Sequence, residues 1–183
     1  MVTIPGLTDR VASFFQENPH RFDLNSGIEP RTFSEKVADV LCKLPIWPYR
    51  TAFDETAEER PLRRTLEMLL QRGIKKQNIH VYLLYAWKDD LNDAIHRLNV
   101  CFEYGVVPMA MRYVPLDWFE SRQSYRPSHW EPLHYIDFAR YVNQLKRHGL
   151  YSKNRWTFED FLVRCESHTH MNDPLLRHEM PRL

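Results

Sequence analysis

The chain has 183 residues and a formal net charge of +1, with 43% hydrophobic and 27% charged residues. This length suffices for one domain with a sizeable core, and the near-zero charge argues against a nucleic-acid partner, which would need a clustered basic face. The sequence contains no apolar run long enough to span a bilayer and no recognisable signal peptide. A cytoplasmic protein without a membrane partner is therefore expected.

The first segments of the chain combine a short strand with a capped helix. Residues 22–27 alternate apolar and polar side chains and stop at a glycine, which predicts a strand. Thr32 and Glu35 are three residues apart and predict a capping box. The helix that follows is expected to end before Pro45, because proline cannot continue a helix.

The same order recurs further along the chain. Residues 49–54 predict a second strand, and Thr56 with Glu59 predicts a second capping box. Apolar residues at helical spacing follow, and Gly73 is expected to close that helix in the left-handed conformation.

A third strand–helix unit and a fourth strand complete the pattern. Residues 79–85 predict a strand, because they are rich in β-branched and aromatic side chains. Asp89 or Asp90 is expected to cap the next helix, which ends at Gly105, and residues 106–113 predict a strand. Four strands that alternate with helices over short connections predict an α/β fold with parallel strands and right-handed crossovers.

The alternation stops after the fourth strand. An aromatic, proline-rich loop follows, and then helices are predicted at 135–148 and 157–165. The chain is expected to divide into a helical lead (1–21), the strand–helix repeat (22–114), an aromatic loop with a helical extension (115–165) and a polar tail (166–183).

The cysteines and the histidines of the tail do not predict a metal site. Cys42, Cys101 and Cys165 are dispersed, and no CxxC or CxxxCxxC arrangement exists, which argues against a disulfide framework and a self-contained cluster site. His168 and His170 follow Cys165 closely, but with His178 they match no standard zinc pattern.

One face of the first three predicted strands is unusually polar. Because side chains alternate along a strand, six of them are expected to converge across neighbouring strands: Asp23, Asn25, Arg50, Asp54, His80 and Tyr82. Arg112, near the end of the fourth strand, adds a cation at the same rim. Two interpretations remain open. One is an internal salt-bridge network, such as Arg50 with Asp23 or Asp54, and the other is a polar ligand pocket at the carboxyl ends of the strands.

Four segments of these strands occur together in a recognisable order: Gly27-Ile-Glu-Pro-Arg31, Arg50-Thr-Ala-Phe-Asp54, Val81-Tyr-Leu-Leu84 and Met109-Ala-Met-Arg-Tyr113. This succession resembles the later strands of radical S-adenosylmethionine barrel proteins, especially the microbial and phage group related to iron–sulfur oxidoreductases, over about residues 22–118. The resemblance implies a partial (βα) TIM-like barrel of about four parallel strands with flanking helices and a C-terminal helical extension.

The resemblance also implies a cofactor and a set of positions for it. The later strands of the family line the nucleoside part of S-adenosylmethionine. Carried over position by position, the cofactor contacts would lie among seven residues: Asn25, Arg31, Arg50, Asp54, Tyr82, Met111 and Arg112.

The family's iron–sulfur motif has no counterpart in this sequence. In the family, a CxxxCxxC loop after the first barrel strand binds a [4Fe–4S] cluster that cleaves S-adenosylmethionine to a radical, and no CxxxCxxC occurs here. The resemblance therefore implies the C-terminal barrel portion of such a protein, which does not ligate the cluster and is not catalytic alone. Its partner would be a separate N-terminal half-barrel chain or a second copy.

Two alternatives to a barrel portion remain. One is a catalytically silent binding or assembly module derived from the same fold. The other is a different small α/β enzyme that uses Asp54, His80 and Arg112 as acid–base and charge-stabilising groups.

Overall fold

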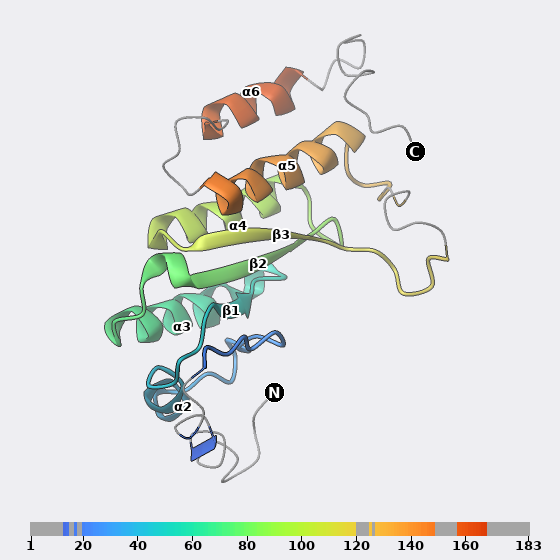
Figure 1. Ribbon diagram of the computed structural model, residues 1–183. Helices are drawn as coiled ribbons and strands as arrows, with labels where there is room; N and C mark the ends of the chain where they lie inside the picture. Colours follow the sequence, from blue (N-terminus) through green and yellow to red (C-terminus); the bar gives the residue numbers. More distant parts are fainter. Residues whose placement is uncertain are drawn as a thin grey trace.

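Three parallel strands form the sheet at the centre of the molecule (Figure 1). A computed structural model describes residues 13–14, 17, 20–119, 125, 127–148 and 157–167. The strands lie side by side in sequence order: β1 (Tyr49–Ala52), β2 (Ile79–Tyr85) and β3 (Val107–Arg112).

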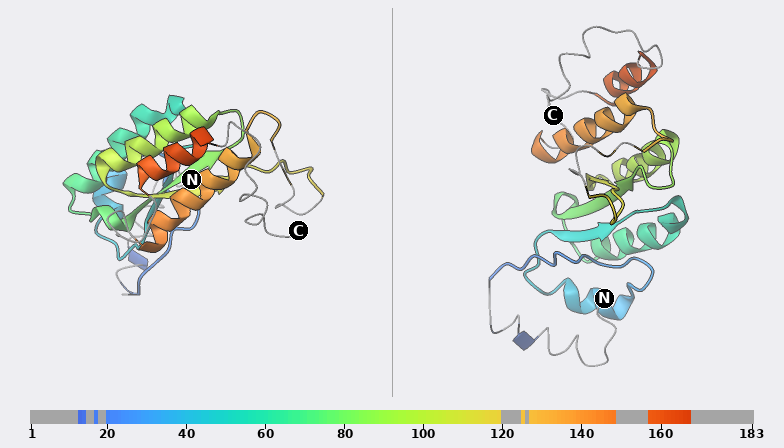
Figure 2. Two further views of the ribbon diagram at one scale, coloured as in Figure 1. Left: turned by 90° about the horizontal axis from the view of Figure 1, so that it is seen from above. Right: turned by 90° about the vertical axis from the view of Figure 1, so that its right-hand side faces the viewer.

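Five α-helices flank this sheet in the described part of the chain: α2 (Glu35–Leu41), α3 (Glu59–Gln71), α4 (Leu91–Tyr104), α5 (Pro132–His148) and α6 (Phe158–Ser167). Helix α3 connects β1 to β2, and α4 connects β2 to β3. Both connecting helices cover the same face of the sheet (Figure 2), as right-handed crossovers between neighbouring parallel strands require. Over the described residues, none of the helices combines the length and the apolar character needed to cross a membrane.

The strand register confirms a parallel α/β sheet. Arg50 of β1 pairs with His80 of β2, and Tyr82 of β2 pairs with Met109 of β3. Side chains at paired positions point to the same face of a sheet, so the register defines which residues share a face.

Residues 22–27, the first predicted strand, do not form a strand in the structure. Only the flanks of this segment pair with the chain beside it. They do so through isolated parallel bridges of Phe22 with Ile46 and of Ile28 with Thr51. The regular sheet therefore has three strands where four were predicted.

A tight turn interrupts the segment between those two bridges. The Gly27 N–H donates to the Leu24 carbonyl at 2.8 Å, and Gly27 has a φ of +73°. A Cβ at this glycine would lie 3.3 Å from the carbonyl oxygen of Arg50. The alternating pattern could not reveal that the backbone enters the left-handed region here, which a regular strand does not tolerate.

The helix starts agree with the predicted caps in only one of the first three cases. Thr32 is not a cap, since Ser34 caps α2. Thr56 begins a short 3₁₀ turn, and α3 then starts without a side-chain cap. Asp90 caps α4 as predicted, in a reciprocal capping box with Asp93.

The core lies between the sheet and helices α3 and α4. Along β2, alternate side chains are buried on this side, while those between them are partly exposed on the other face. The main apolar residues of this layer are Leu62, Leu66, Leu69, Ile79, Val81, Leu83, Leu98 and Cys101, all fully buried. The opposite, partly exposed face of the sheet is called the open face below.

Helix α5 lies beside β3, at the sheet edge opposite β1 (Figures 1 and 2). Tyr85, at the end of β2, anchors this region: its ring centroid is 5.5 Å from that of Trp130, 5.4 Å from Tyr135 and 5.1 Å from Phe138. Helix α6 packs in turn on α5. The outer edge of β3 is therefore covered by a helix, which removes one unprotected strand edge.

Glu59 links α3 to α4 on the surface, and this link makes stability depend on pH. Its carboxylate accepts from Arg63 at 2.7 Å and contacts His96 Nε2 at 2.7 Å. The contact with His96, and then that with Arg63, lowers the pKa of Glu59 from its ordinary value of 4.5. A lowered pKa in the folded state contributes stability that is present above pH 4.5 and is lost as the pH falls through the folded value.

We therefore expect Glu59→Gln to lower the free energy of unfolding by about 0.5–1 kcal/mol at about pH 6. The difference from the native chain should shrink as the pH falls below 4.5. Urea unfolding between about pH 6 and pH 3 measures this. Glu55→Gln, an exposed change nearby, serves as the control. An equal pH profile in the two variants would contradict the assignment.

Candidate functional site

Asp23, Arg50 and Tyr82 form a connected group on the open face, here named the face triad. Arg50 Nε donates to Asp23 Oδ1 at 2.7 Å, and Arg50 Nη1 donates to the Tyr82 hydroxyl. The strand register explains why Arg50 and Tyr82 are neighbours. Arg50 pairs with His80 and Ala52 pairs with Tyr82, so the side chains of Arg50 and Tyr82 point to the same face of the sheet. The predicted ion pair of Arg50 with Asp23 is therefore present.

The face triad is held between the interior and solvent. The Arg50 side chain is 16% exposed and that of Asp23 is 45% exposed. Hydrogen bonding from Arg50 lowers the pKa of Asp23, and the nearby His80 acts in the same direction. The pair with Asp23 in turn raises the pKa of Arg50. Arg50 therefore carries a fixed positive charge, and three of its five N–H groups have partners in the triad.

A second polar group, here named the rim cluster, lies at the carboxyl end of β1 and consists of Arg31, Asp54 and Glu58. The Asp54 N–H donates to Glu58 Oε2 at 2.9 Å, and Arg31 Nη2 lies 3.6 Å from Glu58 Oε1. Burial raises the pKa of Asp54, and repulsion from Glu58 acts in the same direction. The rim cluster therefore brings together two of the predicted site residues, Arg31 and Asp54.

The other three predicted site residues occupy different positions. Met111 pairs with Leu84, whose side chain lies on the open face, so Met111 lies on that face as well. Its exposed fraction is 45%. Asn25 is exposed in the turn of the first segment. Arg112 is at the predicted rim but on the helix-covered side, since it pairs with Tyr85. Its guanidinium carbon lies 4.6 Å from the centre of the Tyr135 ring.

Arg97 of α4 is an important residue that the sequence reasoning missed. Its side chain has no exposure to solvent. Its Nη1 group donates to the carbonyls of Phe53 at 2.8 Å and Asp54 at 2.9 Å, and also to that of Leu84. Its Nη2 group pairs with Asp89. Arg97 with these acceptors is here named the Arg97 clamp.

The Arg97 clamp neutralises charges and carbonyl dipoles that have been taken out of water. Burial lowers the pKa of Arg97 and raises that of Asp89, and the opposite charge of each partner offsets part of this effect. A signal for its burial exists in the sequence: Ala94, Arg97, Leu98 and Cys101 follow the spacing of a helix face that packs on a core. A charged residue in such a stripe must find partners.

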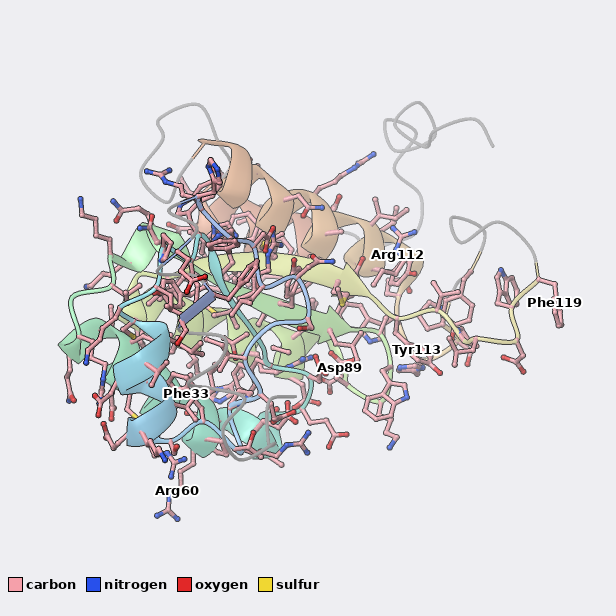
Figure 3. All side chains as sticks on the ribbon, turned by 60° about the horizontal axis from the view of Figure 1, so that its bottom comes forward. Phe33, Arg60, Asp89, Arg112, Tyr113 and Phe119 are labelled. Carbon is pink, nitrogen blue, oxygen red and sulfur yellow. The ribbon has the colours of Figure 1, made fainter. Side chains whose placement is uncertain are left out.

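Aromatic residues border the carboxyl ends of β2 and β3. Trp87 lies 6.1 Å from Tyr113, Tyr113 lies 6.4 Å from Tyr125, and Tyr125 lies 5.3 Å from Trp118, measured between ring centroids. Figure 3 shows Asp89, Arg112 and Tyr113 at this end of the sheet and Phe119 farther out. Phe119 is 97% exposed. The predicted aromatic loop therefore borders the end of the sheet where ligand sites of α/β proteins lie.

Two surface hollows lie away from the face triad. One, of about 580 Å³, is lined by residues of the 3₁₀ turn and the outer side of α3, including Arg60 and Arg64. The other, of about 330 Å³, lies at the start of α4 beside Trp130 and His134. Neither contains a residue of the face triad, so the chemistry of the open face does not depend on these hollows.

The three cysteines lie at or within three different helices. Cys42 lies at the end of α2, Cys101 within α4 and Cys165 within α6. Burial raises the pKa of Cys42 to about 11 and that of Cys101 to about 12, so both thiols are protonated at neutral pH. Within the ranges that the structure describes, no group of three or more His, Cys, Asp or Glu residues is placed to hold a metal ion. His168, His170 and His178 lie outside the described residues.

Comparisons of the chain with protein-family profiles, with curated proteins and with solved structures found no match. The geometry of the open face and its rim is therefore the basis on which a function is proposed.

Proposed function

We propose that the chain is the C-terminal portion of a radical S-adenosylmethionine-type barrel and binds S-adenosylmethionine on the open face. One observation carries this proposal. Successive strand–helix units place their helices on one side of the sheet, and a polar group that contains Arg50 and Tyr82 lies on the other side, where the hollow of a barrel would be. In this proposal residues 22–28 take the position of a fourth, irregular strand of the barrel.

The residues of the open face suit the parts of this cofactor. Arg50 has further N–H groups that would bind the carboxylate of the methionine part. Leu84 and Met111 lie on the same face and would contact the adenine through apolar surface. Asp54, half-buried at the rim, would accept hydrogen bonds from ribose hydroxyls. The cofactor, when bound to a complete enzyme of this kind, supplies the radical, and the residues of this chain bind and orient it.

Calorimetric titration with S-adenosylmethionine tests the proposal. The full chain is expected to bind, and Arg50→Gln should weaken binding about tenfold or more, because a charge-assisted hydrogen bond is worth about 1.5–3 kcal/mol. Asp23→Asn, which removes the ion pair but keeps Arg50, should bind within about threefold of the native chain. Absence of binding, or equal losses in these two variants, would reject a ligand role for Arg50.

A matched surface control and a cluster test complete this experiment. Arg60→Gln changes an arginine that extends from α3 into solvent (Figure 3) and should leave binding unchanged. Anaerobic treatment of the isolated chain with iron and sulfide should produce no stable absorbance near about 400 nm. A stoichiometric cluster on this chain would contradict the proposal that the cluster ligands come from elsewhere.

The internal pairing of Arg50 favours a second candidate, a non-catalytic assembly module with the same fold. In that case the face triad holds neighbouring segments in register, and the open face packs against a separate half-barrel chain or a second copy. If the occupant is a second copy, light scattering coupled to gel filtration should show self-association of a chain that binds no S-adenosylmethionine.

A further inference from the structure

The Arg97 clamp reaches the loops at the carboxyl end of the sheet through Asp89. One carboxylate oxygen of Asp89 pairs with Arg97, and the other accepts from the Trp87 N–H at 3.1 Å. The carbonyl of Asp89 accepts from Trp130 Nε1 at 2.7 Å. One buried guanidinium is therefore linked to the loop after β2 and to the segment that precedes α5.

The loop after β2 needs this support, because its backbone is strained. Ala86 has a φ of 66° and no exposure to solvent. A residue with a Cβ in the left-handed conformation costs of order 1 kcal/mol. Such a conformation persists only when the surroundings determine it, and the bonds from Arg97 to the Leu84 carbonyl and to Asp89 lie on either side of Ala86.

The other end of the clamp reaches the rim cluster. Arg97 donates to the carbonyls of Phe53 and Asp54, the last residues before the chain turns toward α3. The backbone of Asp54 is therefore held from the core side by the guanidinium of Arg97. The same guanidinium holds the loop after β2. The end of β1 and the loop after β2 therefore depend on one side chain.

We propose that Arg97 is a positioning residue. Together with Asp89 it holds, from inside the core, the end of β1 and the two loops that contain Trp87 and Trp130 and border the ligand site. The ligand arm of this inference rests on the proposed function. Affinity then depends on a side chain that lies behind the site, because an error of about 1 Å in the placement of binding groups is enough to weaken a ligand strongly.

The test uses the full chain and two readouts. Arg97→Lys keeps the charge but cannot reach three carbonyls and Asp89 together, and Asp89→Asn is a second variant of nearly the same shape. In both, the indole N–H signal of Trp130, assigned with Trp130→Phe, should exchange with solvent at least about tenfold faster. Binding of S-adenosylmethionine by Arg97→Lys should weaken about tenfold or more. Arg63→Lys, a change on the α3 surface, should alter neither quantity.

The outcomes separate the inference from the proposed function. Unchanged exchange at Trp130 in both variants overturns the role of Arg97, whatever the ligand result. Faster exchange with unchanged affinity overturns its effect on the ligand site. If the native chain binds no S-adenosylmethionine, the proposed function and the ligand arm fail, and the indole signal alone supports or overturns the coupling of the loops by Arg97.

Discussion

Tyr85→Ala is expected to lower the free energy of unfolding by about 3–5 kcal/mol. The side chain is 1% exposed and is surrounded by the rings of Trp130, Tyr135 and Phe138. Alanine would remove the ring and leave a cavity among rings of α5 and of the segment that precedes it. Because Tyr85 joins the sheet to α5, the helix should lose much of its attachment to β3.

Urea unfolding, followed by circular dichroism and by tryptophan fluorescence, measures this effect. Tyr85→Phe is the matched control, because it keeps the ring and removes only the hydroxyl that accepts from Arg112 at 3.4 Å. It should cost less than about 1.5 kcal/mol. A small loss in the alanine variant, or similar losses in both, would show that α5 is attached to the sheet by other contacts.

The second large effect is expected when Asp89 is replaced by alanine. This change removes the carboxylate that pairs with the buried Arg97 guanidinium. Removing one member of a buried ion pair costs about 3–5 kcal/mol, because the remaining charge is not compensated. Asp89→Ala should therefore be among the most destabilising single changes at the carboxyl end of the sheet.

A double-mutant cycle distinguishes this explanation from a simple loss of packing. Arg97→Met removes the buried charge together with its hydrogen bonds. The double variant with Asp89→Ala should be less destabilised than the sum of the two single variants, by about 1–3 kcal/mol. Chemical denaturation of the four proteins gives the coupling. Additive losses would mean that the charge of Arg97 is compensated without Asp89.

The regular elements of this fold were predictable where local signals agree with burial. Residues 79–85 form β2 with the predicted bounds, because β-branched and aromatic residues suit a strand whose alternate side chains enter the core. Helix α4 ends at Gly105, as predicted, and the structure shows this glycine in the left-handed conformation. The turn at Gly27 was not predictable from alternation, because a side-chain pattern does not report the sign of φ.

The candidate site was predictable only in part. Side-chain parity places Arg50 and Tyr82 on one face of their strands, and the structure joins them by a hydrogen bond. Arg112 is on the other face. The register between β2 and β3 decides which face a residue of β3 shares with β2, and the sequence of one strand does not contain this register. The burial of Arg97 was not predicted, because a charged residue in a helix is usually exposed. Its acceptors, such as the Phe53 carbonyl, are distant in sequence.

The turn between Leu24 and Gly27 has a consequence for how other chains could add to this protein. In the part of the chain that the structure describes, α5 lies beside β3 and residues 22–28 lie along the other margin of the sheet, next to β1. This segment itself pairs with the neighbouring chain at only two isolated bridges, Phe22 with Ile46 and Ile28 with Thr51, and a tight turn lies between them. An added strand would find no continuous row of backbone N–H and C=O groups to pair with along this segment. This side of the sheet therefore disfavours the strand-by-strand stacking that forms fibrils.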